Sequence, residues 1–562
     1  MTKKMKNQKE FFSALQLAGS ILLLACSVLL VGYYILFPSR GYFHSDTTDT
    51  IMWAEASCDA GKLFNQDFSY ACLLPFGTSL IMTALIPMTG VSMTTHVSGM
   101  LIFFLIFTGS LILMFRQMGW NWGWISIAVF CELMTCSGSE KLREIFWGHT
   151  IYYSLGICFL FQGLALLFRQ MHLTEHMQNA PEKQKKYYQT HLICCTAGIG
   201  LLFLLTGMNQ ISAITIFSLP VIGAVFCERW FDTKTKLFSV QNLYAVILLA
   251  LMAVTTVLGY LLTNFLSKGI TADYAEAYST YSEIDQWEGH LRLFPTAYLS
   301  LLGVEVSGKD AMMSGKSVIT LLTVIMGALM QILPFIALFF WNQIKDAKLK
   351  ILLLAYWFMT LLIMMGYVLG KLSAANWRLS PIAAMSAVVS AAFLRWAFQQ
   401  KKWQRLAVLL FIPALLVSVS HAGMLLTMPA DNTARSDLYM LSRELEKRNL
   451  SYGYATFWRA NALTIISDSD IKCRMIEPCE AGFYIKKYQV NQHWYEDQPN
   501  QENYFVLLSA QEASSVRNIQ ENLSPERREA IEELEDYSTL SGQHQEITVG
   551  NYEIWIFEEN IF

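Results

Sequence analysis

Long apolar segments are the feature that most constrains what this chain can fold into. About 20 apolar residues in a helix cover the roughly 30 Å of hydrocarbon in a bilayer, and segments of this kind recur from the N-terminus to about residue 427. They predict a polytopic α-helical membrane protein with about eleven transmembrane helices. The candidate spans are about 14–37, 93–115, 122–137, 150–168, 191–207, 210–228, 241–266, 317–341, 350–370, 379–397 and 405–427.

The composition supports this class and excludes others. Of the 562 residues, 54% are hydrophobic and 15% are charged, which is too apolar for a soluble protein. The net charge is −3, and the basic residues lie in short loops between apolar spans, so the sequence does not predict nucleic-acid binding. No small-residue cleavage signature follows the first span, which we therefore interpret as a retained helix.

The segment 73–88 decides the topology, because an additional span there would place every later loop and the tail on the other side of the membrane. Its sixteen or so residues would reach only about 24 Å as a helix, and Pro75, Gly77 and Pro87 interrupt it. If it lies along the interface, most Lys and Arg residues fall on the side of the N-terminus. This predicts a cell-membrane protein with a cytoplasmic N-terminus, a membrane domain at 1–427 and an extracytoplasmic domain at 428–562.

The tail at 428–562 has the patterns of a small α/β domain. Residues 436–449 carry apolar side chains at helical spacing, and 452–458 and 504–508 are typical of buried strands. Pro525 is well placed to begin a helix. Residues 544–557 predict a hairpin around Gly550-Asn551.

The eleven cysteines do not predict a disulfide framework. Most of them fall in apolar spans, where cysteine behaves as a small hydrophobic residue. Only Cys58 with Cys72, and Cys473 with Cys479, are placed outside the spans on the oxidising side, and whether they pair is open. No Cys/His spacing resembles a zinc site, so we predict no structural metal; a divalent metal cofactor has no support in the sequence.

An acidic segment follows the first span. Asp46 stands where a helix N-cap would stand, Asp49 is placed as in a capping box, and Gly61 is placed as the C-terminal stop. This gives the two aspartates a structural interpretation. The other interpretation is that a carboxylate at the membrane surface acts as general base toward a hydroxyl group.

The acidic segment also carries a resemblance to a known family. The pattern Asp-x-x-Asp-x-x-x-Trp-Ala-x-Ala (46–56), Gly61 and the apolar stretch after Pro75 resemble the first outer loop of the GT-C glycosyltransferases, such as protein O-mannosyltransferases and aminoarabinose transferases. The resemblance implies a polyprenyl-phosphate sugar as donor, an Asp of this loop as catalytic base, and inversion at the anomeric carbon. The distance to Gly61 favours Asp46 as that base, whereas the Trp-Ala-x-Ala match favours Asp49.

The sequence departs from the family where phosphate binding is expected. Thr follows both aspartates in place of the usual Glu, and Leu74-Pro75-Phe76 lacks the basic residue and the second proline. Arg378, in Asn376-Trp377-Arg378-Leu379-Ser380-Pro381, resembles the Arg-Tyr-x-x-Pro segment of many family members. A guanidinium offers a planar fork to phosphate oxygens. The alternative is that Arg378 and Trp377 are interfacial anchors.

Glu144 and His149, in the outer loop 138–149, are weaker substrate-binding candidates. A histidine at the membrane interface is often only a solvated amphipathic side chain without a role in binding. With Arg378 and Trp377, Glu144 and His149 complete the expected substrate site. The sequence thus predicts a membrane glycosyltransferase that transfers a lipid-linked sugar to an extracytoplasmic glycan, lipid or protein. Alternatives are a flippase or transporter, a glycan polymerase or ligase, and a GT-C fold that has lost catalysis and serves as an accessory protein.

Overall fold

The computed structural model describes residues 3–72, 74–232, 243–271, 280–307, 311–371, 375–479, 482–499, 501–532, 534, 536–540 and 543–562. The chain packs as two compact units. The first comprises Met1–Tyr34, Phe103–Leu266 and Glu276–Met428, and the second comprises Ile35–Ile102, Ser267–Ala275 and Pro429–Phe562. We call them the helical unit and the tail unit, and each is described by itself.

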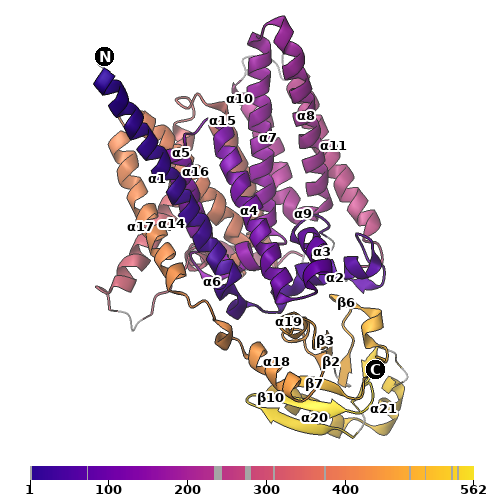
Figure 1. The fold of residues 1–562 in the computed structure, drawn as a ribbon. Helices are drawn as coiled ribbons and strands as arrows, with labels where there is room; N and C mark the ends of the chain where they lie inside the picture. Colours follow the sequence, from indigo (N-terminus) through magenta and orange to yellow (C-terminus); the bar gives the residue numbers. More distant parts are fainter. Residues whose placement is uncertain are drawn as a thin grey trace. The chain divides into compact units, whose positions relative to one another are not determined.

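Long apolar helices dominate the chain (Figure 1). Within the described residues, ten are long and apolar enough to cross a membrane, which confirms the polytopic helical prediction. One of the ten, Gln210–Trp230, is continuous through α9 (Gln210–Ala213), a π-helical turn η4 (Ile214–Ser218) and α10 (Leu219–Asp232). The other nine are α1 (Lys3–Leu36), α4 (Met93–Gln117), α7 (Tyr153–Asn179), α8 (Glu182–Met208), α11 (Leu243–Leu266), α14 (Gly315–Phe339), α15 (Ala347–Leu369), α16 (Ser380–Gln399) and α17 (Gln404–Thr427).

The remaining expected span is the shorter helix α5 (Trp122–Cys136). Its 15 residues extend about 22 Å, less than a typical hydrocarbon thickness. Asn121 caps it by accepting a hydrogen bond from the Trp124 N–H at 3.0 Å. Its residues from Ile125 onward are mostly buried, and it packs against α16 and α17. Because its neighbours are protein, its length does not have to match the lipid.

Helices α8 and α11 pack closely side by side in the helical unit (Figure 1). A Cβ added to Gly207 would lie 2.1 Å from the Thr256 carbonyl oxygen, and one added to Gly259 would lie 2.1 Å from the Leu204 carbonyl oxygen. Only glycine allows two helix backbones to approach this closely, as small residues do at many membrane helix interfaces.

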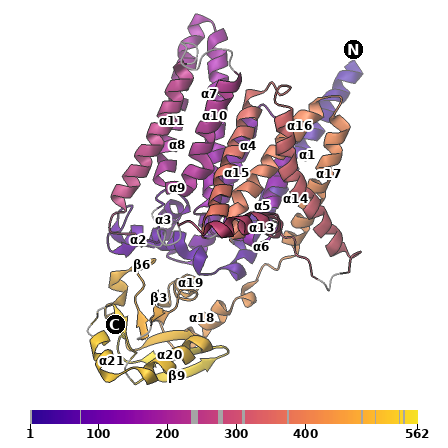
Figure 2. The same ribbon diagram turned by 180° about the vertical axis from the view of Figure 1, so that it is seen from behind.

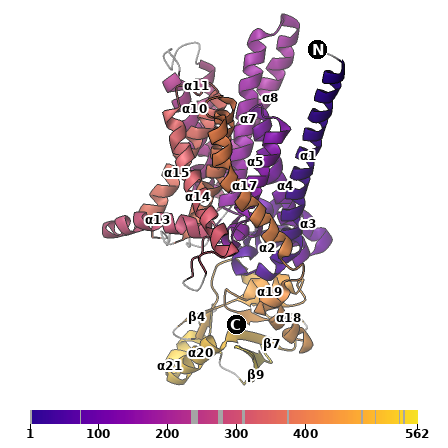
Figure 3. The same cartoon turned by 90° about the vertical axis from the view of Figure 1, so that its left-hand side faces the viewer.

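A further helix lies between the candidate spans 241–266 and 317–341, where no helix was predicted. After a 3₁₀ turn η6 (Ile284–Gln286), α13 (Trp287–Leu301) runs crosswise to the long helices (Figures 2 and 3). His290 Nδ1 lies 2.8 Å from the Val368 carbonyl oxygen of α15. The helix is thus anchored to a transmembrane helix of the same unit.

The first outer segment forms the N-terminal part of the tail unit. It contains η1 (Pro38–Tyr42), η2 (Ser45–Thr48), α2 (Asp49–Ala60), β1 (Phe68–Ser69) and α3 (Thr78–Thr89). With 12 residues, α3 would extend about 18 Å and is too short to span a bilayer. It begins at Thr78, after Gly77, so Pro75 is not part of its first turn.

The C-terminal part of the tail unit is built on a five-stranded sheet in the order β3-β2-β7-β10-β9. Strand β2 pairs in parallel with β3 and β7, and the hairpin β9–β10 adds antiparallel to β7. A Cβ on Gly453 of β2 would lie 2.2 Å from the Phe505 carbonyl oxygen. The strands are β2 (Tyr452–Ala455), β3 (Lys472–Met475), β7 (Tyr504–Ser509), β9 (Gln545–Val549) and β10 (Tyr552–Phe557).

Helices and smaller strands complete this part. The helices confirm the patterns expected at 436–449 and 525, and the hairpin β9–β10 confirms the one expected at 544–557. The helices are η8 (Thr433–Arg435), α18 (Asp437–Lys447), α19 (Ala460–Ile466), η9 (Gln492–Tyr495), α20 (Ala510–Asn522) and α21 (Pro525–Glu532). A three-stranded sheet joins β4 (Glu477–Cys479), β5 (Gly482–Tyr484) and β8 (Tyr537–Ser538). No disulfide joins any of the eleven cysteines, all of which lie in the described part of the chain, so neither of the two pairs whose bonding was open is bonded.

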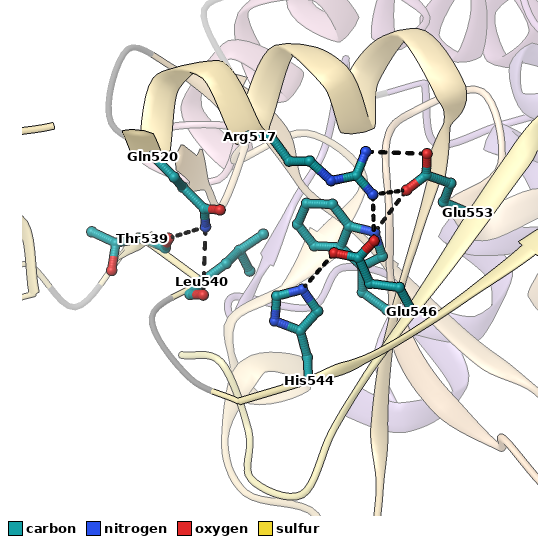
Figure 4. A network of polar contacts seen from close by, with 8 residues as sticks. Arg517, Gln520, Thr539, Leu540, His544, Glu546 and Glu553 are labelled. Atoms are coloured by element: carbon teal, nitrogen blue, oxygen red, sulfur yellow. Dashed lines mark hydrogen bonds and ion pairs between the residues drawn. The ribbon is translucent and has the colours of Figure 1, made fainter. Parts of the chain in front are cut away.

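Arg517 fixes α20 to the sheet (Figure 4). Its guanidinium donates to both carboxylate oxygens of Glu553 on β10 and to Glu546 on β9. These hydrogen bonds raise the pKa of Arg517 and lower the pKa of Glu553. The network belongs to the fold of the sheet and is distant in sequence from the acidic segment.

Candidate functional site

The acidic segment begins in the short 3₁₀ turn η2 and continues into α2 within the tail unit. Asp46 lies in η2, and Asp49 is the first residue of α2. The turn packs against α19. Gly61 ends α2 in the left-handed conformation, with φ of 59°, as the sequence predicted.

The capping role expected for the two aspartates is wrong. His44 occupies the N-cap position of η2, and Thr48 occupies that of α2. The reciprocal capping contact joins His44 with Thr47, whose hydroxyl accepts from the His44 N–H at 3.2 Å. The local prediction failed because a threonine one residue after Asp46 supplies the oxygen that the capping box needs.

The two aspartates differ in exposure. The side chain of Asp46 is 41% exposed, and one of its oxygens lies 4.0 Å from His44 Nδ1. Asp49 is only 5% exposed. A base must reach the hydroxyl group that it deprotonates, so the exposure favours Asp46 as the reactive carboxylate.

Arg378 lies in the helical unit, in the 3₁₀ turn η7 (Asn376–Leu379) directly before α16. Pro381 stands in the first turn of α16, where the absence of its N–H costs nothing. The guanidinium hydrogen-bonds the Tyr153 hydroxyl at the start of α7. Its Nη1 would be 3.5 Å from a Cβ built on Gly370 at the C-terminal end of α15, where the helix dipole favours a cation.

Lys141 joins Glu144 to Trp377, the residue directly before Arg378. The Lys141 ammonium lies 2.6 Å from a Glu144 carboxylate oxygen and 5.2 Å from the centre of the Trp377 ring. A cation over an indole face is attracted by the ring quadrupole. Three of the four substrate-binding candidates thus belong to one cluster, which we call the cationic cluster: Lys141, Glu144, Tyr153, Trp377 and Arg378.

His149 lies at the border of this cluster. The segment 138–149 is helical rather than a loop, with α6 (Glu140–Arg143) followed by a π-helical turn η3 (Glu144–Gly148). The His149 N–H donates to the Glu144 carbonyl oxygen at 2.6 Å, which closes the turn, and the His149 ring lies edge-on to Tyr152 at 6.4 Å. Single π-helical turns are frequent at functional sites.

Neither Tyr153 nor Lys141 was predicted from the sequence as a site residue. The tandem Tyr152-Tyr153 at the start of a span was the available signal for the first, since interfacial tyrosines offer a hydroxyl group to polar partners. No sequence pattern indicates that Lys141 would lie on Trp377, which is 236 positions later. Among the described residues, no group of three His, Cys, Asp or Glu residues could hold a metal ion.

The fold of the chain is similar to a solved structure, that of ArnT from Cupriavidus metallidurans bound to undecaprenyl phosphate. The match covers 96% of this chain and 98% of that chain, with a TM-score of 0.53. The chain therefore has an ArnT-like membrane fold. The sequence identity is 9%, so the likeness concerns the fold alone. No family model matches the sequence, and no curated protein matches it.

Proposed function

We propose that this protein is a membrane glycosyltransferase that transfers a sugar from a polyprenyl-phosphate donor to a hydroxyl group of an acceptor outside the cytoplasm. The observation that carries the proposal is the ArnT-like fold over nearly the whole chain, together with the half-exposed Asp46 in the first outer segment. The ArnT structure holds undecaprenyl phosphate, which supports a lipid-linked donor. The sugar-free polyprenyl phosphate is one product.

Asp46 acts as the general base in this proposal. The acceptor oxygen attacks the anomeric carbon while the bond from that carbon to the phosphate oxygen breaks. Asp46 takes the proton of the acceptor hydroxyl, and the bonding electrons leave with the polyprenyl phosphate. A positioned base contributes roughly 10²–10⁴-fold to such a rate.

Arg378 binds the departing phosphate. A guanidinium keeps its charge at any working pH and can donate two parallel hydrogen bonds to phosphate oxygens. Tyr153 orients it from one side. Lys141 supplies a second cation, which lies against the Trp377 ring and is held in place by Glu144.

The donor is tested by ligand binding. The full-length protein in nanodiscs should gain thermal stability from undecaprenyl phosphate but not from undecaprenol, which lacks the phosphate. Arg378→Lys should reduce this gain in stability, because lysine lacks the planar guanidinium that donates two parallel hydrogen bonds to a phosphate. Arg292→Lys on the exposed face of α13 is the matched control and should leave it unchanged. Equal stabilisation by both lipids would contradict the proposal.

The base is tested by an isosteric substitution. Asp46→Asn should lower the release of polyprenyl phosphate from a panel of radiolabelled polyprenyl-phosphate sugars roughly 10²–10⁴-fold. Expression and the melting temperature should stay near those of the wild type. Asp67→Asn, an exposed aspartate of the same outer segment, is the matched control. Full activity of Asp46→Asn, Asp49→Asn and the double variant would exclude both aspartates as the base.

A further inference from the structure

The helix α2 that follows Asp46 is held on two opposite sides by residues of the C-terminal part of the tail unit. Trp53 and Glu55 are two positions apart, and side chains at this spacing point about 200° apart around a helix. Trp53 is in contact with Gln489, and Glu55 is in contact with Arg474. A helix held on both sides can neither rotate nor slide without breaking one of these contacts.

Gln489 forms the first contact from a conformation that is costly to maintain. Its φ is 56°, in the left-handed region that is unfavourable for a residue with a long side chain. Three hydrogen bonds hold it there. Its N–H donates to the Ser69 carbonyl oxygen at 2.7 Å, its carbonyl accepts from Asn461 Nδ2 at 3.3 Å, and its Oε1 accepts from Trp53 Nε1 at 2.6 Å. The residue is 1% exposed.

Arg474 forms the second contact from a buried position on β3. Its guanidinium lies 3.7 Å from the centre of the Trp494 ring and 4.0 Å from a Glu55 carboxylate oxygen, and it hydrogen-bonds the Tyr452 hydroxyl. The Arg474 side chain is 3% exposed and that of Glu55 is 14% exposed. A buried charge that loses its partner is strongly destabilising, so the pair resists separation.

Burial raises the pKa of Glu55, and Arg474 partly offsets this effect. Burial also raises the pKa of Asp59, one turn later on α2, and the charges of Arg474 and Lys472 partly offset this rise. The charge of Arg474 therefore acts on two acidic groups of the same helix. It complements α2 electrostatically as well as sterically.

We propose that Gln489 and Arg474 are positioning residues for the catalytic carboxylate, so that the C-terminal part of the tail unit sets the geometry of the general base by clamping α2. This inference rests on the proposed function. Asp46 lies seven residues before Trp53, and Asp49 lies one helical turn before it, so a displaced α2 moves both carboxylates. A displacement of about 1 Å can cost roughly 10²-fold in rate.

Three variants release the clamp without removing a catalytic group. Trp53→Phe deletes the indole N–H and keeps an aromatic ring. Gln489→Asn tolerates the left-handed conformation but is one methylene too short to reach the indole. Glu55→Gln keeps the shape and removes the charge that faces Arg474. Arg517→Gln is the control, because Arg517 contacts β9 and β10 (Figure 4), at the opposite edge of the sheet from the β3 strand that carries Arg474.

Two measurements on the full-length protein test the proposal. Hydrogen exchange of the α2 amides should be faster in the three clamp variants and unchanged in Arg517→Gln. The kcat for sugar transfer should fall roughly 10–100-fold in the clamp variants with KM for the lipid donor unchanged, whereas Arg517→Gln should lower only the melting temperature. Trp53→Phe combined with Gln489→Asn should cost no more than either alone, since both remove one hydrogen bond.

Each outcome decides the proposal. Unchanged exchange of α2 in all three variants overturns the clamp. Faster exchange with an unchanged kcat overturns its link to catalysis. A wild-type protein that transfers no lipid-linked sugar refutes the proposed function, and the exchange of α2 alone then decides whether the clamp exists.

Discussion

At the scale of single residues, the sequence indicates an acidic segment after the first span but not which of its residues caps a helix and which is exposed. Asp46, Thr47 and Asp49 all carry an oxygen that can cap a helix, and which oxygen is used depends on where the turn begins. That start is set by His44 and by packing of η2 against α19, which is more than 400 positions away in the chain. Exposure, which separates Asp46 from Asp49, is likewise a property of the folded chain.

The pH dependence of the tail unit should reflect Glu553. Its hydrogen bonds to Arg517 hold its pKa below the ordinary value of 4.5. The unfolded chain therefore binds a proton at a higher pH than the folded one, and the stabilisation is present above about pH 4.5 and lost as the pH falls through the folded pKa. We expect a contribution of roughly 0.2–1 kcal/mol, the range measured for solvent-exposed ion pairs.

Melting curves of the full-length protein between pH 3 and 7 measure this contribution. In Glu553→Gln the melting temperature should be lower at pH 7 and should fall less toward acidic pH than in the wild type. Glu558→Gln, an exposed glutamate directly after the same strand, should keep the wild-type profile. Parallel profiles for the wild type and Glu553→Gln would show that the pair contributes nothing.

At the scale of elements, the long spans were predictable because hydrophobic length is a local property, and ten of them agree with the expected ranges. The crosswise helix α13 was missed because its first half carries charged residues and it is too short and polar to be recognised as a span. A signal for it existed. Phe294, Tyr298 and Leu301 recur at intervals of four and three, the period of a helix with one buried face, and Tyr298 and Leu301 are buried.

The contact between α8 and α11 should depend on its glycines. Gly259→Ala places a methyl group where the Leu204 carbonyl oxygen now lies, so the two helices must separate. We expect a destabilisation of about 1–3 kcal/mol, typical of overpacking, seen as a lower melting temperature in detergent. Gly109→Ala in α4 is the control, because nothing lies within 4 Å of its added Cβ. Equal melting temperatures for the two variants would contradict the close approach.

At the scale of the whole molecule, the compact units do not follow the order of the chain. The first outer segment, 35–102, clusters with the C-terminal residues from Pro429 onward, and its strand β1 pairs with β6 (Val490–Asn491). No sequence pattern could indicate this, because a two-residue strand has no recognisable period and its partner lies about 420 positions later. The acidic segment is consequently supported by residues that a linear division of the chain assigns to another domain.

The membrane topology of the molecule depends on whether the short helix α5 crosses the bilayer. If α5 crosses together with the ten longer helices, the number of crossings is odd, and the N-terminus and the tail lie on opposite sides of the membrane. The distribution of Lys and Arg then puts the tail outside.

A cysteine at Glu529, an exposed position of α21, should react with a membrane-impermeant maleimide in intact cells. A cysteine at Gln184, exposed at the start of α8, should react only after permeabilisation. The native thiols Cys58, Cys72 and Cys479 are replaced by serine in both variants to remove background labelling. Reaction of both positions from the same side would mean that α5 does not cross, and the acceptor of the proposed reaction would then have to be sought on the side where the tail is found.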